Sequence, residues 1–165
     1  MKPVLGLPGR NPETERWMAA LLAAVGFGDA EVARYRHWQR DVEPDLHKEA
    51  AAYPVADRSL VVAKSMGTMV LLAAADEGVP DRAVLIGVPI NAYSDEQVDG
   101  LVALAGRIPC LFIQQLEDFT GGAAALQQAL GDVASVEALV GSDHVYADVD
   151  ELAALIADWQ VGQDG

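Results

Sequence analysis

The sequence predicts an α/β protein with a doubly wound, mostly parallel six-stranded sheet and helices on both faces. Short apolar segments alternate with longer amphipathic segments along the chain, which is typical of βαβ units. The central apolar segments carry no charge, as expected of strands that helices cover on both faces. The second and sixth segments are charged and belong at the edges, which with right-handed crossovers gives the order 2-1-3-4-5-6.

The elements follow one another in a regular order. The expected strands are Pro3–Gly6, Glu31–Trp38, Ser59–Ala63, Ala83–Val88, Cys110–Gln114 and Ser135–Val140. The expected helices are Pro12–Val25, Asp45–Tyr53, Met66–Glu77, Asp95–Ala105, Gly122–Leu130 and Val149–Gln160. Asn11 is the expected N-cap of the first helix, with Pro12 at its first helical position. In the last helix, apolar residues three or four positions apart predict a core-facing stripe: Val149, Leu152, Ile156 and Trp159.

Composition limits the class of protein. The length of 165 residues fits one domain, 1–165, and 52% hydrophobic residues argue against disorder. The net charge of −14 argues against nucleic acid or an anionic membrane as a partner, because both are polyanions. The single cysteine, Cys110, excludes an internal disulfide. Without a membrane-length apolar run or a signal-peptide pattern, we expect a cytoplasmic protein. Composition does not indicate an oligomeric state.

Ser65 lies between the third expected strand and the helix that follows it at once. Small residues flank it two positions away on each side, Ala63 and Gly67. This is the pattern of a nucleophile elbow, G-x-S-x-G, with alanine at the first glycine. The sharp turn of such an elbow lifts the hydroxyl clear of the sheet. Lys64 and Ser65 also match the end of a phosphate-binding P-loop, but Arg58 and Ala63 stand where that motif requires glycine.

An acid and a histidine follow the fifth and sixth strands, on the same rim as Ser65. The acid segment is Gln114-Gln115-Leu116-Glu117-Asp118, and the histidine segment is Gly141-Ser142-Asp143-His144. Here the sequence resembles the α/β-hydrolase fold family, in which an apolar strand precedes H-G-x-x-D and a later strand precedes G-x-x-H. The resemblance covers nearly the whole chain and departs from the family pattern at Ala63 and at Gln114-Gln115.

The resemblance implies a minimal α/β-hydrolase fold with a catalytic triad. Ser65 would attack an acyl carbon, His144 would move its proton, and Asp118 would orient the imidazole. The oxyanion would be held by two backbone N–H groups, those of Met66 and of Leu7. Leu7 lies in Leu5-Gly6-Leu7-Pro8-Gly9, where the family often has H-G-F-P-G.

No cofactor or metal ion is expected for this chemistry. Acidic residues cluster around His144 in the sequence, but their spacing fits neither an EF-hand loop nor a His-x-x-x-His zinc motif: Asp143, Asp148, Asp150 and Glu151. The other two histidines are weaker candidates, because His37 falls at the end of an edge strand and His47 on a polar helix surface.

The leading hypothesis is a serine hydrolase that cleaves carboxylic esters or thioesters of a small-molecule acyl substrate. The alternative is a catalytically silent protein-interaction module on the same fold. In the resembled family a cap domain is commonly inserted after the fourth strand of this sheet, but the connection Pro89–Pro109 holds only a loop and a helix. We therefore expect an open crevice that prefers short acyl chains. Its expected walls are Leu7, Met66, Ile90, Tyr93, Phe119, Val145 and Tyr146.

Overall fold

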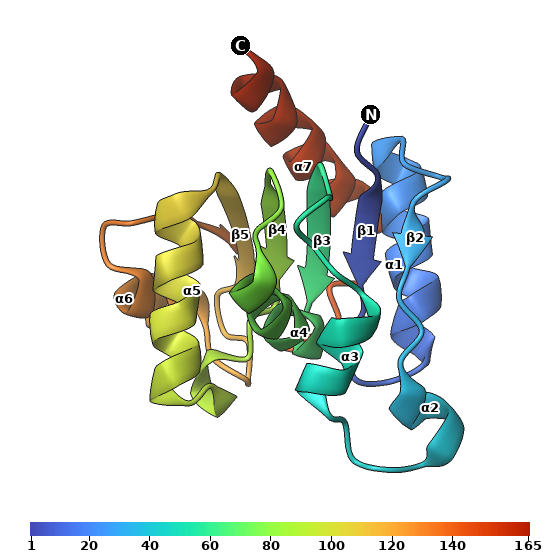
Figure 1. Cartoon of the computed structure of the whole chain (residues 1–165). Coiled ribbons are helices and arrows are strands. Elements are labelled where there is room, and N and C mark those ends of the chain that lie inside the picture. Colours follow the sequence, from blue (N-terminus) through green and yellow to red (C-terminus); the bar gives the residue numbers. More distant parts are fainter.

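The structure, a computed structural model, describes all 165 residues as a parallel sheet between two layers of helices (Figure 1). The strands are β1 Val4–Leu7, β2 Glu31–Val32, β3 Leu60–Lys64, β4 Ala83–Ile86, β5 Cys110–Gln115 and β6 Val136–Leu139. The helices are α1 Glu13–Val25, α2 Arg36–Arg40, α3 Leu46–Ala52, α4 Met66–Ala74, α5 Asp95–Arg107, α6 Ala123–Leu130 and α7 Val149–Asp164. Short 3₁₀ turns follow α4 (η1, Ala75–Glu77) and β4 (η2, Ile90–Ala92).

The sheet is entirely parallel, with the order β2-β1-β3-β4-β5-β6. The fold class and the strand order predicted from the sequence are therefore confirmed. Because all strands run the same way, their carboxyl ends lie at one rim, at the lower edge of the sheet in Figure 1. The winding direction reverses between β1 and β3, which is where open α/β sheets bind ligands.

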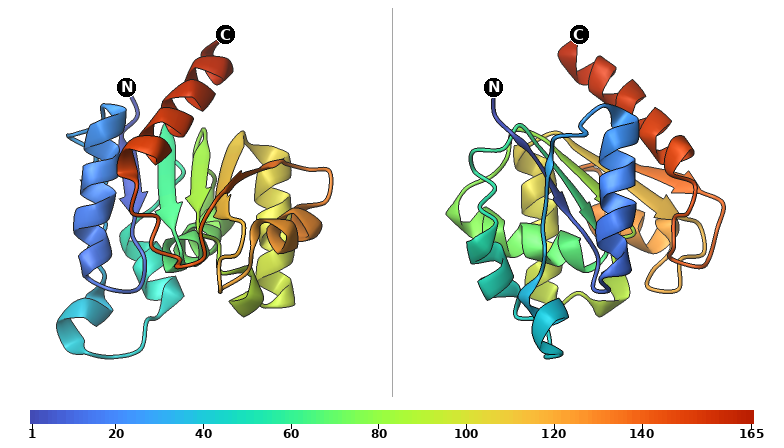
Figure 2. Two further views of the ribbon diagram at one scale, coloured as in Figure 1. Left: turned by 180° about the vertical axis from the view of Figure 1, so that it is seen from behind. Right: turned by 90° about the vertical axis from the view of Figure 1, so that its right-hand side faces the viewer.

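Two hydrophobic cores lie on opposite faces of the sheet. Helices α1 and α7 pack on one face, while α3, α4, α5 and α6 cover the other (Figure 2). Side chains alternate between the faces along each strand, so Val61 and Ala63 enter one core and Leu60 and Val62 enter the other. This double burial explains why the central strands carry no charge apart from Lys64, the last residue of β3.

The expected strand Glu31–Trp38 is wrong beyond Val32. β2 ends at Val32, and the chain then turns into α2, which begins at Arg36. Three side chains fasten this segment to the loop after β1. The hydroxyl of Tyr35 donates to the carbonyl oxygen of Pro8 at 2.7 Å. His37 Nε2 and Trp38 Nε1 form hydrogen bonds with the carbonyl oxygen of Arg10, at 2.8 and 2.6 Å. These tertiary contacts outweigh the charged pattern that predicted a longer edge strand.

Helix ends follow the sequence in most cases. Asp148 caps α7 by accepting a hydrogen bond from the N–H of Glu151, 3.0 Å away. The expected cap at Asn11 is wrong, because α1 begins after Pro12 without a side-chain cap. In the first turn of α1, the hydroxyl of Thr14 donates to the carbonyl oxygen of Asn11 at 2.6 Å.

The connection between β4 and β5 holds η2 and α5 and no cap, as expected. Helix α5 begins with a reciprocal capping box, in which Ser94 and Gln97 each bond the backbone of the other. No helix is both long and apolar enough to cross a membrane.

Candidate active site

Ser65 occupies a tight turn between β3 and α4. Its φ of 53° and ψ of −119° lie in a region that residues other than glycine rarely adopt. The hydroxyl of Thr68 stabilises the turn by donating to the carbonyl oxygen of Ser65 at 2.6 Å. Gly67 is required at this turn, because a Cβ there would collide with the carbonyl oxygen of Leu7. The residue pattern of the elbow therefore corresponds to a real strained strand–turn–helix junction.

The structure brings the three predicted site residues together. Ser65 Oγ lies 2.8 Å from His144 Nε2, and His144 Nδ1 lies 2.8 Å from Asp118 Oδ2. An ionised carboxylate can only accept a hydrogen bond, so Nδ1 carries the proton in this arrangement. Nε2 is then left with a free lone pair and accepts the hydroxyl hydrogen of Ser65. This is the tautomer that a histidine needs to act as a general base toward a serine.

The carboxylate of Asp118 is fully buried and saturated with donors. Its Oδ1 accepts from the N–H of Thr120 at 2.9 Å and from the hydroxyl of Thr120 at 2.7 Å. Its Oδ2 accepts from the hydroxyl of Tyr146 at 2.8 Å, besides His144. Burial alone would raise the pKa of Asp118, but the hydrogen bonds from His144, Thr120 and Tyr146 outweigh it and lower the pKa below its ordinary value. Asp118 is thus an anion at neutral pH.

The two glutamines that depart from the family pattern hold the acid in place. Gln114 Nε2 donates to the carbonyl oxygens of Val88 and Gly121, at 2.8 and 2.7 Å, and its Oε1 accepts from the N–H of Val88. Gln114 thereby joins the loop after β5 to the end of β4.

Gln115 joins the same loop to the segment Val140–Asp148, which we call the histidine loop. Its Oε1 accepts from the N–H of His144 at 2.8 Å, and its Nε2 donates to Asp143 Oδ1 at 2.9 Å. The neighbouring Glu117 is exposed, whereas Asp118 is buried. The glutamines therefore do not displace the acid from the register in which the sequence placed it.

Gly87, directly after β4, leaves space for the imidazole of His144. Its φ is 61°, and a Cβ at this position would lie 2.8 Å from Tyr146 Cε2 and 3.2 Å from His144 Cε1. Only glycine leaves room for both rings. Gly87 and Thr120 were not predicted from the sequence. The available signal was their position at the carboxyl ends of β4 and β5, on the rim that carries the triad.

The structure supports one of the two expected oxyanion donors, the N–H of Met66, more directly than the other, the N–H of Leu7. Met66 is the first residue of α4, so its N–H has no partner within the helix. The loop after β1 borders the site, since a Cβ on Gly9 would lie 3.6 Å from the Cβ of Ser65. The assignment of the second donor to the N–H of Leu7 stays a prediction. The side chain of Leu7 is fully buried in the core.

The expected walls of the crevice need correction. Leu7, Met66 and Ile90 are buried in one core and Tyr146 in the other, so these side chains offer little or no surface to a substrate. Tyr93 is half-buried. The exposed apolar surface beside the triad comes from Phe119 and Val145, which are 71% and 52% exposed. The Phe119 ring lies edge-to-face with His144, with 5.5 Å between their centroids.

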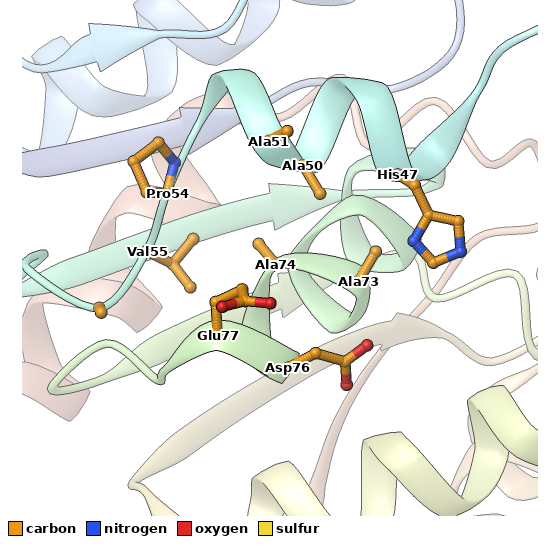
Figure 3. Close-up of a pocket in the computed structure, with 10 residues that line it drawn as sticks. His47, Ala50, Ala51, Pro54, Val55, Ala73, Ala74, Asp76 and Glu77 are labelled. Carbon is orange, nitrogen blue, oxygen red and sulfur yellow. The ribbon is translucent and has the colours of Figure 1, made fainter.

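A separate cavity of about 310 Å³ lies between α3 and the end of α4 (Figure 3). Alanine side chains form much of its lining, and His47, Asp76 and Glu77 lie along it. Neither Ser65, Asp118 nor His144 lines this cavity.

No group of three or more His, Cys, Asp or Glu side chains converges as metal ligands do. His37 and His47 take no part in the hydrogen-bonded arrangement around Ser65.

Comparison with solved structures supports the fold assignment. No protein-family model matches the sequence, and no curated protein is significantly similar to it. The structure superposes on a provisionally assigned hydrolase of the alpha/beta superfamily from Xanthomonas campestris pv. campestris. The match has a TM-score of 0.69 and covers 98% of this chain and 99% of the other, at 15% sequence identity. At this level of identity, the similarity establishes a shared compact, cap-less fold.

Proposed function

We propose that the protein is a serine hydrolase that cleaves carboxylic ester or thioester bonds of small acyl substrates. The observation that carries the proposal is the continuous hydrogen-bonded chain from Ser65 Oγ through His144 to the buried carboxylate of Asp118, with 2.8 Å at each step. A silent interaction module would have no need of a strained serine, a buried anion and a histidine in the tautomer that joins them.

The reaction would proceed through an acyl-enzyme. Ser65 Oγ attacks the acyl carbon while His144 Nε2 takes the hydroxyl proton, and the resulting imidazolium is stabilised by Asp118. The negative oxygen of the tetrahedral intermediate is held by the N–H of Met66 and, as we infer, that of Leu7. His144 returns the proton to the departing alcohol or thiol, and a water molecule then releases the acid by the same steps in reverse order. The proposed reaction steps require no cofactor.

The first experiment is covalent labelling with a fluorophosphonate, which phosphonylates activated serines. Wild-type protein should be labelled once, at Ser65, and should hydrolyse p-nitrophenyl acetate. Ser65→Ala should lose the label and lower kcat by several orders of magnitude, since triad members act as a unit. Ser142→Ala is the matched control, because Ser142 is an exposed serine in the histidine loop. A folded wild-type protein that reacts with neither reagent would favour the interaction-module alternative.

A further inference from the structure

Lys64, the residue before Ser65, buries its ammonium group beneath the histidine loop. The residue is only 4% exposed, and its Nζ donates a hydrogen bond to the backbone carbonyl oxygen of His144 at 2.9 Å. A lysine so deeply buried normally has a carboxylate partner, because an unpaired charge is poorly solvated in a protein core. The ammonium of Lys64 forms no ion pair, so the carbonyl of His144 is its direct polar partner.

Two aromatic rings complete the surroundings of the ammonium group. Nζ lies 5.6 Å from the ring centroid of Trp17 and 5.4 Å from that of Tyr146, within the range of cation–π attraction. Both rings are themselves tied to the site. Trp17 Nε1 donates to the carbonyl oxygen of Tyr146 at 2.9 Å, and the hydroxyl of Tyr146 donates to Asp118. The ammonium group of Lys64 therefore contacts the histidine loop at two points, the backbone carbonyl of His144 and the aromatic ring of Tyr146.

The histidine loop needs such support because its backbone is strained. His144 and Tyr146 have φ values of 64° and 56°, in the left-handed region that favours glycine. Conformations of this kind persist only where surrounding contacts hold them. A carbonyl fixed by a charged donor is one such contact, and charge-assisted hydrogen bonds are stronger than neutral ones.

The protonation of Lys64 is sensitive to pH in the range where hydrolases are assayed. Burial lowers the pKa of Lys64 to about 8, while the charges of Asp118 and Asp143 act in the opposite direction. The other titratable groups around it are His144 and Tyr146, and burial raises the pKa of Tyr146 so that this phenol stays protonated. Helix α1 contributes the uncharged Trp17 to this contact.

We propose that Lys64 is a positioning residue of the active site, which in its ammonium form fixes the carbonyl of His144 and thereby aims the imidazole at Ser65. The proposal rests on the proposed hydrolase function. Neutral Lys64 would hold the carbonyl less firmly. Activity should therefore fall on the alkaline side as this lysine loses its proton.

Kinetics of Lys64→Met test the positioning role, because methionine keeps an unbranched chain and removes the charge. We expect kcat to fall about 10- to 100-fold with KM within about threefold, since Lys64 does not touch substrate. The alkaline decline of kcat in the wild type, centred near pH 8, should be absent in Lys64→Met. Lys48→Met, at an exposed lysine of α3, is the matched control and should behave as wild type.

Carbon-13 NMR gives a readout that is independent of catalysis and requires no variant to fold. The chain has three histidines, so labelling the histidine carbonyl carbon gives signals for His37, His47 and His144. The His144 signal should shift with a midpoint near pH 8 in the wild type, while the other two serve as internal references. A His144 carbonyl signal that does not move through this range would overturn the proposal. So would an unchanged kcat and pH profile in folded Lys64→Met.

The outcomes distinguish a failure of the proposed hydrolase function from a failure of the role of Lys64 alone. If wild-type protein is not labelled by fluorophosphonate, the proposed hydrolase function fails and the positioning role fails with it. If wild-type protein is labelled at Ser65 but Lys64→Met keeps full activity, only the role of Lys64 fails.

Discussion

The hydroxyl of Tyr146 donates to the same carboxylate oxygen of Asp118 that His144 Nδ1 reaches, at 2.8 Å in each case. The same Tyr146 hydroxyl accepts a hydrogen bond from the N–H of Gln115 at 2.8 Å. One phenol thus joins the end of β5, the acid and the histidine loop. Its position two residues after His144 means that the chain segment that supplies the base also supplies a support for the acid.

The acid of the triad can be identified by comparing two neighbouring variants. Asp118→Asn should lower kcat by about 10³- to 10⁴-fold, because a neutral amide can no longer stabilise the imidazolium or select its tautomer. Glu117→Gln should retain most activity, since Glu117 is exposed and adjacent in sequence. Both would be assayed with p-nitrophenyl acetate after circular dichroism has shown that they fold. The opposite ranking would assign the acid to Glu117.

Gly87→Ala tests the space beneath the imidazole. The new Cβ would press on Tyr146 and His144 at a positive φ, so we expect a loss of about 1–3 kcal/mol in the free energy of unfolding. The displaced imidazole should lower kcat by on the order of 100-fold. Gly100→Ala on α5 meets open space and is the control; it should leave kcat unchanged and stabilise the helix by up to about 1 kcal/mol. Wild-type activity in Gly87→Ala would show that the site tolerates the shift.

The burial of Lys64 predicts a trade-off between stability and activity. The pKa of Lys64 is about 8 in the folded protein against an ordinary value of 10.5, so the unfolded chain binds more protons between these values. Wild-type stability should therefore contain a component that rises as pH increases from about 8 to 10.5.

Lys64→Met lacks that component. It should be more stable than wild type below pH 8, by on the order of 3 kcal/mol, with the difference fading as pH approaches 10.5. Urea unfolding of both proteins at pH 7, 8.5 and 10 measures this. A difference that is the same at all three pH values would contradict the assigned burial penalty.

Acyl-chain length should matter only over a few carbons. Phe119 and Val145 offer a small exposed apolar surface beside His144, and each buried methylene is worth about 0.8 kcal/mol only while such a surface covers it. Across p-nitrophenyl esters from acetate to palmitate, kcat/KM should rise at first and then level off.

Phe119→Ala should flatten the initial rise in kcat/KM, whereas Val161→Ala, an exposed apolar change on α7, should not. A steady increase of kcat/KM toward palmitate would point to a deep acyl tunnel and would contradict an open substrate surface.

The sheet and the triad were predictable because their signals are local. Strand order followed from the charge-free runs and the charged edge segments. Ser65 was found from its position directly after a strand, and Asp118 and His144 from segments that follow the fifth and sixth strands and resemble the family motifs. The segment after β2 was not predictable in this way. The segment Glu31–Trp38 has the charges of an edge strand, and only the contacts of Tyr35, His37 and Trp38 with Pro8 and Arg10, distant in sequence, reveal why the chain turns into α2.

The supporting residues were missed for a related reason. Gln114 and Gln115 stood out only as departures from a family pattern, and their role depends on partners in β4 and in the histidine loop. Lys64 could be assigned no role because its neighbours, Trp17 and Tyr146, lie far away in the chain. Which polar groups meet across the rim is a property of tertiary structure.

The bridge that Gln115 makes between the end of β5 and the histidine loop bears on how the protein would lose the proposed activity. Through Gln115 and Tyr146, the loops after β5 and β6 are fastened to each other as well as to the sheet. Segments joined in this manner open together rather than fraying separately, so their amide hydrogens should exchange with solvent as one cooperative unit. The loss of activity on heating should therefore coincide with unfolding of the sheet. A partly heated sample should contain active folded molecules and inactive unfolded molecules, with few that are folded but inactive.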